Sequence, residues 1–181
     1  MKIHIALFRG INVGGKNALA MKDLAAVLET LGARKVRTYI QSGNAVFLHG
    51  AEGTSLLSNR IRAEIRKRRG FDPHVLLLGL KDFERAVRQN PFAEAETDPK
   101  ALHAGFLAAA PERPDMKTME SLRSGGERFR LIGRVFYLHA PKGVGRSRLA
   151  ANAEKLLGVP MTDRNWSTVL AVWKMVQKLQ P

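Results

Sequence analysis

The fold of this chain is decided by residues 34–49, RKVRTYIQSGNAVFLH. Val36, Thr38 and Ile40 alternate with polar residues, which is the period-two pattern of a half-buried strand. The triplet SGN at 42–44 is a turn signal, and the apolar run after it predicts a returning strand. We therefore predict a β-hairpin in the middle of the first half of the chain.

On either side of this hairpin, the sequence predicts one strand and one helix. KIHIALF at 2–8 indicates a strand, and MKDLAAVLETLG at 21–32 has helical spacing and ends in the glycine expected of a helix C-cap. Apolar residues spaced at helical intervals over 57–65 mark a second helix, and HVLLLG at 74–79 predicts a buried strand. The resulting order is β-α-β-β-α-β, the split arrangement of a ferredoxin-like unit.

The same pattern starts again after a polar linker. VFLHGAEG at 46–53 matches FYLHAPKG at 136–143 at a spacing of ninety residues, so we predict an internal duplication. The fold class is then α+β, with two tandem ferredoxin-like units and a C-terminal helix. We expect one unit over 1–80, a helix and linker over 81–100, and the second unit with its closing helix over 101–181.

The chain of 181 residues carries 30 basic and 16 acidic side chains, a formal net charge of +14 at pH 7. An excess of this size attracts nucleic acid, nucleotides or acidic lipid headgroups. The excess is shared by both halves, with 16 basic and 7 acidic residues over 1–90 and 14 and 9 over 91–181. Two interpretations stay open: attraction of a polyanion, or a preference for arginine on solvated faces.

Several classes of protein are disfavoured by what the sequence lacks. It has no cysteine, and no apolar run approaches the roughly 20 residues that cross a bilayer. The first ten residues are too short and too charged to act as a secretory signal. We therefore expect a cytoplasmic protein with no membrane partner. The sequence leaves the oligomeric state open.

Familiar catalytic sets are also missing from the sequence. There is no cysteine nucleophile and no G-x-S-x-G elbow, and the five histidines have no ligand spacing such as H-x-x-x-H. We therefore predict no metal site and no cofactor. Catalytic residues stay unidentified, and the sequence does not decide whether the protein is an enzyme.

Residues 10–16, GINVGGK, spell G-x-x-x-x-G-K, the phosphate-binding loop of nucleotide hydrolases. In such a loop the next residue is a Ser or Thr that holds Mg²⁺, but here it is Asn17. The segment also belongs to a β-α-β-β unit and not to a parallel β-α-β sheet. These departures argue against a Mg²⁺-dependent nucleotide hydrolase.

A less demanding anion site stays open at this glycine loop. Gly14 and Gly15 allow backbone N–H groups to form a concave, anion-binding nest. Charge and neutral hydrogen-bonding groups would come from Arg9, Asn12, Lys16 and Asn17. The alternative interpretation is a glycine-supported turn with an exposed lysine.

The predicted topology brings a second motif to this loop. In a ferredoxin-like unit the first and third strands are the antiparallel central pair, so Arg9 at the end of one should lie near Ser42 and Asn44 at the start of the other. The ligand-binding set that we predict is Arg9, Asn12, Gly14, Gly15, Lys16, Asn17, Tyr39, Gln41, Ser42 and Asn44. We expect it to bind a phosphate-bearing small molecule or a nucleotide. None of these residues is an obvious base, which favours binding, and a small enzyme acting on a phosphorylated metabolite is the alternative.

A second alternative is a nucleic-acid binder that contacts the phosphate backbone without reading sequence. The basic residues for this interpretation lie in the segment RIRAEIRKRRG: Arg60, Arg62, Arg66, Lys67, Arg68 and Arg69. The aromatic residues on which RNA-recognition modules stack bases are not at the required strand positions. A basic helix of this kind can equally be a solvated surface.

Five ordered motifs, LFRGINVGGKN, VRTYIQSGNAVF, NPF, YLHAPKGVGRSRL and DRNWSTV, run from the first strand to the final helix. In these motifs the chain resembles the family called domain of unknown function 1697. The resemblance implies two tandem ferredoxin-like units in a bacterial cytosolic protein, and it implies no agreed activity, substrate or cofactor. Beyond the set above, the motifs point to Gly10, Gly43, Asn165 and Trp166. Asn165 can also be explained as the N-cap of the last helix.

Overall fold

The structure, a computed structural model, describes residues 1–50 and 53–180. The chain divides into two compact units. The first unit holds Met1–Arg85 together with the chain from Ala171 onward, and the second holds Ala86–Leu170.

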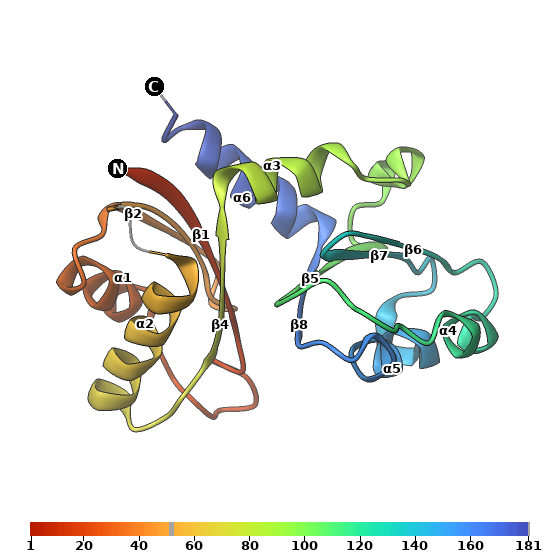
Figure 1. The fold of residues 1–181 in the computed structure, drawn as a ribbon, viewed down its shortest axis with the longest axis horizontal. Coiled ribbons are helices and arrows are strands. Elements are labelled where there is room, and N and C mark those ends of the chain that lie inside the picture. The colour runs from red at the N-terminus through yellow and green to blue at the C-terminus, as the bar shows by residue number, and fades with distance from the viewer. Residues whose placement is uncertain (51–52, 181) are drawn as a thin grey trace. The chain divides into compact units, whose positions relative to one another are not determined.

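Strands and helices follow one another along the chain in the predicted order (Figure 1). In order, they are β1 (Lys2–Arg9), α1 (Met21–Thr30), β2 (Arg34–Tyr39), β3 (Asn44–His49), α2 (Thr54–Arg69), β4 (His74–Gly79), α3 (Leu80–Arg88), the 3-10 turn η1 (Ala93–Thr97), β5 (Leu102–Leu107), α4 (Met116–Leu122), β6 (Arg128–Ile132), β7 (Val135–His139), the 3-10 turn η2 (Val144–Arg146), α5 (Arg148–Leu157), β8 (Met161–Asn165) and α6 (Trp166–Gln177).

The first unit has a four-stranded sheet in the order β2-β3-β1-β4, with every neighbouring pair antiparallel. β1 and β3 are the central pair, as predicted. Their register places Leu7 opposite Asn44 at one end of the sheet and Lys2 opposite His49 at the other. The end of β1 and the start of β3 therefore meet at the same edge.

Helices α1 and α2 lie on one side of this sheet (Figure 1). Alternate residues of the strands face them, among them Phe8 and Phe47, which are fully buried. Leu28 of α1 and Ile61 and Ile65 of α2 complete this core. The apolar residues that recur every 2 positions in the strands and every 3.6 positions in the helices thus pack together in one core.

The second unit has the same strand order, β6-β7-β5-β8, again antiparallel throughout. Its core joins Phe136 and Leu138 of β7 to Leu149, Ala153 and Leu157 of α5. Two β-α-β-β-α-β units followed by a C-terminal helix confirm the predicted fold class.

Helix α6 begins directly after β8. The Asn165 side-chain oxygen accepts a hydrogen bond of 2.9 Å from the Thr168 backbone N–H, which is the geometry of an N-cap. Trp166 is fully buried, with its ring 6.4 Å from that of Tyr137. Both residues therefore have structural roles. Among the residues that the structure describes, no helix combines the length and the apolar character needed to cross a membrane.

Candidate functional site

Asn12 ties the glycine loop to the rest of the first unit. Its side-chain amide donates to the backbone oxygen of Leu19 at 2.8 Å and to that of Gln41 at 2.7 Å. Its side-chain oxygen accepts from the Leu19 N–H at 2.7 Å. One bond reaches the turn before β3, so the two motifs predicted to form a site are in direct contact.

A second asparagine closes the base of the loop. The Asn17 side-chain amide donates to the Gly10 backbone oxygen at 2.7 Å, and the Asn17 backbone oxygen accepts from the Asn12 N–H at 3.1 Å. Both asparagines have positive φ angles, 54° for Asn12 and 53° for Asn17. Asparagine tolerates this left-handed conformation better than most residues, so these two positions favour it for structural reasons.

The tip of the loop is a tight turn. The Lys16 N–H donates to the Val13 backbone oxygen at 3.1 Å, and Gly14 and Gly15 between them have φ angles of +58° and +74°. Two successive positive φ angles are the pattern of a type I′ turn. Anion binding by the backbone N–H groups of this turn stays a prediction. The turn leaves the Lys16 side chain exposed.

The QSGN turn (residues 41–44) packs directly against the loop. The Phe8 N–H donates to the Gly43 backbone oxygen at 2.8 Å. Gly43 has a φ angle of +80°, and a Cβ atom at this position would lie 2.5 Å from Ile11 Cδ1 and 2.6 Å from Phe8 Cβ. Only glycine fits here. The buried Asn44 holds the turn from inside by donating to the Tyr39 backbone oxygen at 3.1 Å and to Ser42 Oγ at 3.3 Å.

The register places further members of the predicted set on one face of the sheet. Tyr39 lies opposite Asn44, and Asn44 lies opposite Leu7, two residues before Arg9. Arg9 itself lies opposite His74 of β4. The sequence did not predict that His74 lies at this edge. By alternation these side chains share the face of the sheet turned away from α1 and α2.

All ten residues of the predicted set therefore lie at one edge of the first unit, but the side chains of three of them hold its structure together. The side chains of Asn12, Asn17 and Asn44 are used in hydrogen bonds that hold the loop and the turn. Arg9, Lys16, Gln41 and Ser42 are exposed. A ligand at this edge would meet the exposed side chains and the backbone of the loop.

Two apolar side chains at this edge were not expected. Val13 is 66% exposed and Ile40 is 49% exposed. The sequence pattern placed Ile40 on a strand with Val36 and Thr38, but β2 ends at Tyr39 and Ile40 has a φ angle of +49°. A β-branched residue rarely adopts this conformation, and no periodic pattern reveals it.

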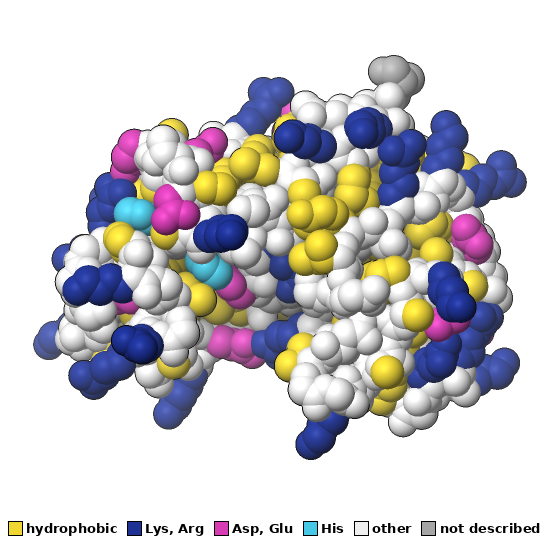
Figure 2. Space-filling view, turned by 180° about the vertical axis from the view of Figure 1, so that it is seen from behind, with side chains coloured by type: hydrophobic (Ala, Val, Ile, Leu, Met, Phe, Trp, Pro, Cys, Tyr) yellow, Lys and Arg dark blue, Asp and Glu magenta, His cyan; other side chains and the backbone are white. Residues whose placement is uncertain are grey.

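The basic segment proposed for nucleic acid is partly neutralised. Arg62 forms two hydrogen bonds with Asp72 at 2.9 and 2.6 Å, and Arg68 pairs with Glu64 at 2.6 Å. Arg69 pairs with Asp23 of α1. Arg62, Arg68 and Arg69, three of the six residues named for that interface, are thus in ion pairs. On the face shown in Figure 2, Lys and Arg side chains are scattered between other residues.

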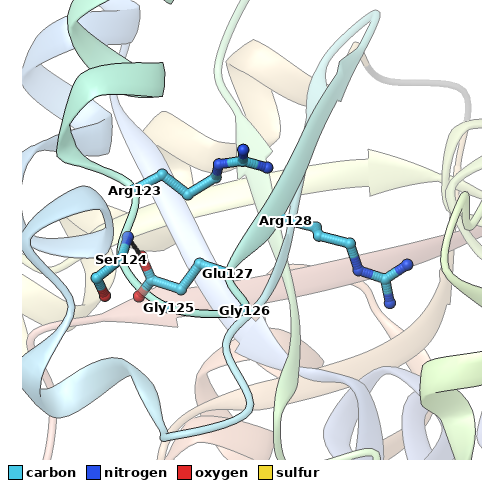
Figure 3. A pocket seen from close by; sticks show the side chains of 6 residues that line it. All are labelled: Arg123, Ser124, Gly125, Gly126, Glu127 and Arg128. Carbon is cyan, nitrogen blue, oxygen red and sulfur yellow. Dashed lines mark hydrogen bonds between the residues drawn. The ribbon is translucent and has the colours of Figure 1, made fainter.

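A pocket of about 360 Å³ lies at the turn between α4 and β6, lined by residues 123–128 (Figure 3). The Glu127 side chain is turned back to accept a 2.9 Å hydrogen bond from the Ser124 N–H. The two arginines of the turn pair elsewhere, Arg123 with Glu120 and Arg128 with Glu94, each at 2.6 Å. Because these polar groups already bond to protein partners, the turn is a weaker candidate for anion binding than the glycine loop.

A pair formed by the buried His103 and the exposed Asp163 in the second unit resembles the histidine–aspartate pair of some catalytic sites. His103 Nδ1 lies 2.7 Å from Asp163 Oδ2, and His103 Nε2 lies 3.2 Å from the Lys100 backbone oxygen. Because both ring nitrogens face acceptors, neither is left to act on a substrate. Burial alone would lower the pKa of His103, but the hydrogen bond and charge of Asp163 outweigh it and raise that pKa. Across the described residues, no group of three or more His, Asp or Glu is arranged to hold a metal ion.

The His103–Asp163 pair gives a testable pH dependence. Because the folded-state pKa is raised above 6.5, the pair contributes stability that is complete below about pH 6.5 and is lost as the pH rises through the folded-state value. We expect Asp163→Asn to lower the free energy of unfolding by about 1 kcal/mol in mild acid, a value reduced by the exposure of Asp163, and by less at pH 8. Urea unfolding at several pH values measures this. Glu112→Gln is the control, and an equal loss at every pH would contradict the assignment.

Comparison with known proteins agrees with this structure. A solved structure described as that of the conserved bacterial protein SP0830 from Streptococcus pneumoniae is 29% identical, with a TM-score of 0.70 over 96% of this chain and 98% of that one. No curated protein sequence matches the chain. The family model described as protein of unknown function (DUF1697) matches residues 1–137. A match of this length, over a chain that carries the family's motifs in order, shows that the protein belongs to the DUF1697 family.

Proposed function

We propose that the edge formed by the glycine loop and the QSGN turn binds a phosphate-bearing small molecule. The observation that carries this proposal is the 2.7 Å hydrogen bond from Asn12 to the Gln41 backbone oxygen, which makes one surface of two segments 29 residues apart. Arg9 and Lys16 bring positive charge to this surface. A phosphate group suits such a combination of cations and turn backbone.

The exposed apolar residues favour a ligand with more than a bare phosphate. Val13 and Ile40 lie on the loop and the turn that carry the charged and polar side chains. They can contact the face of a base or a sugar, while Gln41 and Ser42 offer hydrogen bonds. A nucleotide or a phosphosugar therefore suits the edge better than inorganic phosphate.

The strained backbone of Ile40 is a further support. A non-glycine residue held in this conformation costs on the order of 1–3 kcal/mol and persists only where its surroundings fix it. Such residues are concentrated at binding sites and switch regions. No side chain of the set is an obvious general base, so we propose binding and leave a reaction on a phosphorylated metabolite as the alternative.

Lys16→Ala is the most direct test by mutation. We expect the variant to fold as the wild type does and to bind pyrophosphate or a nucleoside diphosphate about tenfold more weakly, since one charge-assisted hydrogen bond to phosphate is lost. Isothermal titration calorimetry measures the affinity. Raising the salt concentration should weaken binding by the wild type more than by the variant.

Lys117→Ala, which removes an exposed lysine of α4, serves as the matched control. Its affinity for the same ligands should equal that of the wild type. If Lys16→Ala and Arg9→Ala both bind as the wild type does, the ligand does not occupy this edge. Binding of short RNA that depends on Arg66 and Lys67 instead would favour the nucleic-acid interpretation.

A further inference from the structure

A groove of about 1300 Å³ lies at the end of the first sheet where β1 begins and β3 and β4 end. All of its lining residues belong to the first unit. His4 lines the groove, whereas Arg9 ends the same strand at the opposite edge, on the order of 16 Å away. The groove is therefore separate from the glycine loop, and a ligand bound in it is independent of the function proposed for that loop.

His4 is the unusual residue of this groove. It is only 3% exposed, and among the described residues neither ring nitrogen makes a hydrogen bond of good geometry, although the Gly50 backbone lies close enough to interact weakly with the ring. Its ring stacks on that of Phe47 at 5.8 Å and meets the edge of His49 at 6.1 Å. Burial lowers the pKa of His4 by more than the nearby Gly50 backbone raises it, so the ring is neutral near pH 7 and offers one donor and one acceptor.

Buried polar groups in native proteins nearly always have a partner, from the protein, from ordered water or from a ligand. His49, the neighbouring histidine, follows this rule at one nitrogen, because its Nε2 lies 3.0 Å from the Leu31 backbone oxygen, while its Nδ1 has no partner among the described residues. In His4 neither ring nitrogen makes a hydrogen bond of good geometry. A polar group of a bound molecule is the partner that its place on the groove wall suggests.

Two helices begin at this groove. α2, with 16 residues, starts at Thr54, and among the described residues no side chain caps its first turn. α3, with 9 residues, starts at Leu80 directly after β4. The first N–H groups of a helix have no partner within the helix and carry partial positive charge, so both termini favour an anion.

The other residues that line the groove indicate which further chemical groups a ligand would carry. Lys2 and Lys81 add positive charge, and Asp82 in the first turn of α3 offsets part of it. Leu48 and Leu80 are among the apolar residues of the wall. A molecule with one anionic group and an apolar body satisfies both kinds of surface.

We propose that this groove binds a small amphiphilic anion, a carboxylate- or phosphate-bearing molecule with an apolar body, and that His4 hydrogen-bonds to it. The two helix termini face the charged group, and the apolar wall contacts the rest of the molecule. Inorganic phosphate, which has no apolar part, binds this groove weakly or not at all.

The test follows the imidazole NMR signals of His4 in the full chain during titration with octanoate, octyl phosphate and inorganic phosphate. We expect saturable shifts with one or both amphiphiles at millimolar concentrations and none with inorganic phosphate. The two amphiphiles distinguish a carboxylate from a phosphate ligand. This measurement on the wild type needs no variant to fold.

His4→Phe keeps a stacked ring against Phe47 and removes both nitrogens. We expect it to bind the amphiphile at least tenfold more weakly, measured by thermal shift or calorimetry, and to unfold at a higher temperature without ligand. Lys117→Ala, which removes an exposed lysine of α4, is the matched control and should bind the amphiphile as the wild type does. The proposal is overturned if the His4 signals do not move with either amphiphile, or if His4→Phe binds both as tightly as the wild type.

Discussion

Gly43→Ala should lower the free energy of unfolding by about 3 kcal/mol or more, the largest effect expected of any single methyl group added to the first unit. The left-handed backbone alone costs an alanine about 1–2 kcal/mol. The new Cβ would also lie 2.6 Å from Phe8 Cβ, an atom fixed by the central strand, so the strand or the turn must shift. Chemical denaturation of the full chain measures the loss.

Gly10→Ala separates the two causes of this loss. Gly10 has a φ angle of +79°, nearly that of Gly43, but a Cβ atom there meets nothing within 4 Å. We expect Gly10→Ala to cost about 1–2 kcal/mol, from backbone strain alone. If Gly43→Ala costs no more than Gly10→Ala, the turn and the loop are not packed as the structure has them.

Asn12→Ala is expected to have the second-largest effect, a loss of about 3 kcal/mol in the free energy of unfolding. The change removes three hydrogen bonds, two with the backbone of Leu19 and one with that of Gln41, each with a net value of about 0.5–1.5 kcal/mol. It also places an alanine at a φ angle of +54°. The same variant should lose affinity for the phosphate ligand, because the loop is no longer held against the turn.

Asn12→Gly provides the comparison, since glycine adopts the positive φ angle without strain but makes none of the side-chain bonds. Its free energy of unfolding, measured by chemical denaturation, should lie between those of the wild type and Asn12→Ala. Asn152→Ala removes an asparagine whose side chain, among the described residues, bonds to the Arg148 backbone oxygen of its own helix, so it should change stability by less than about 1 kcal/mol. An Asn12→Ala protein as stable as the wild type would show that this asparagine does not join the two motifs.

The sequence predicts the fold well because the elements follow simple periods. The alternation over Val36 and Thr38, the turn at Ser42–Asn44 and the helical stripe through Ile61 and Ile65 each depend on near neighbours in the chain. Given the order β-α-β-β-α-β, the central position of β1 and β3 follows from topology. The meeting of the glycine loop and the QSGN turn can therefore be expected from the sequence alone.

The sequence does not reveal which residues at that edge hold its structure and which are placed to meet a ligand. The sequence predicts Asn12 as a ligand-binding residue, but its hydrogen bonds join positions 12 and 41, a tertiary contact that no local pattern encodes. The sequence predicts a glycine-supported turn at Gly14 and Gly15, but the type of turn depends on the φ angles of both residues, which the sequence does not give. Ile40 continues the alternating strand pattern in the sequence, but its backbone is left-handed because tertiary packing overrides the local preference.

The groove beside His4 is also beyond sequence reasoning. Its lining comes from the start of β1, the ends of β3 and β4, the first turns of α2 and α3, and the last described residues after α6. His4 alternates with Ile3 and Ile5 as an ordinary strand residue does. Among the described residues with buried polar side-chain atoms that lack a well-formed hydrogen bond, His4 is the one in which both ring nitrogens do so, and no sequence pattern reveals this.

A backbone-amide NMR titration of the full chain with pyrophosphate tests the central claim, that the glycine loop and the QSGN turn form one anion site. The account predicts that the amides of residues 14–17 and of residues 41–44 shift together, with a single dissociation constant for both segments, and that Lys16→Ala weakens both equally. Shifts confined to one segment, different constants for the two, or no shift in either would contradict it.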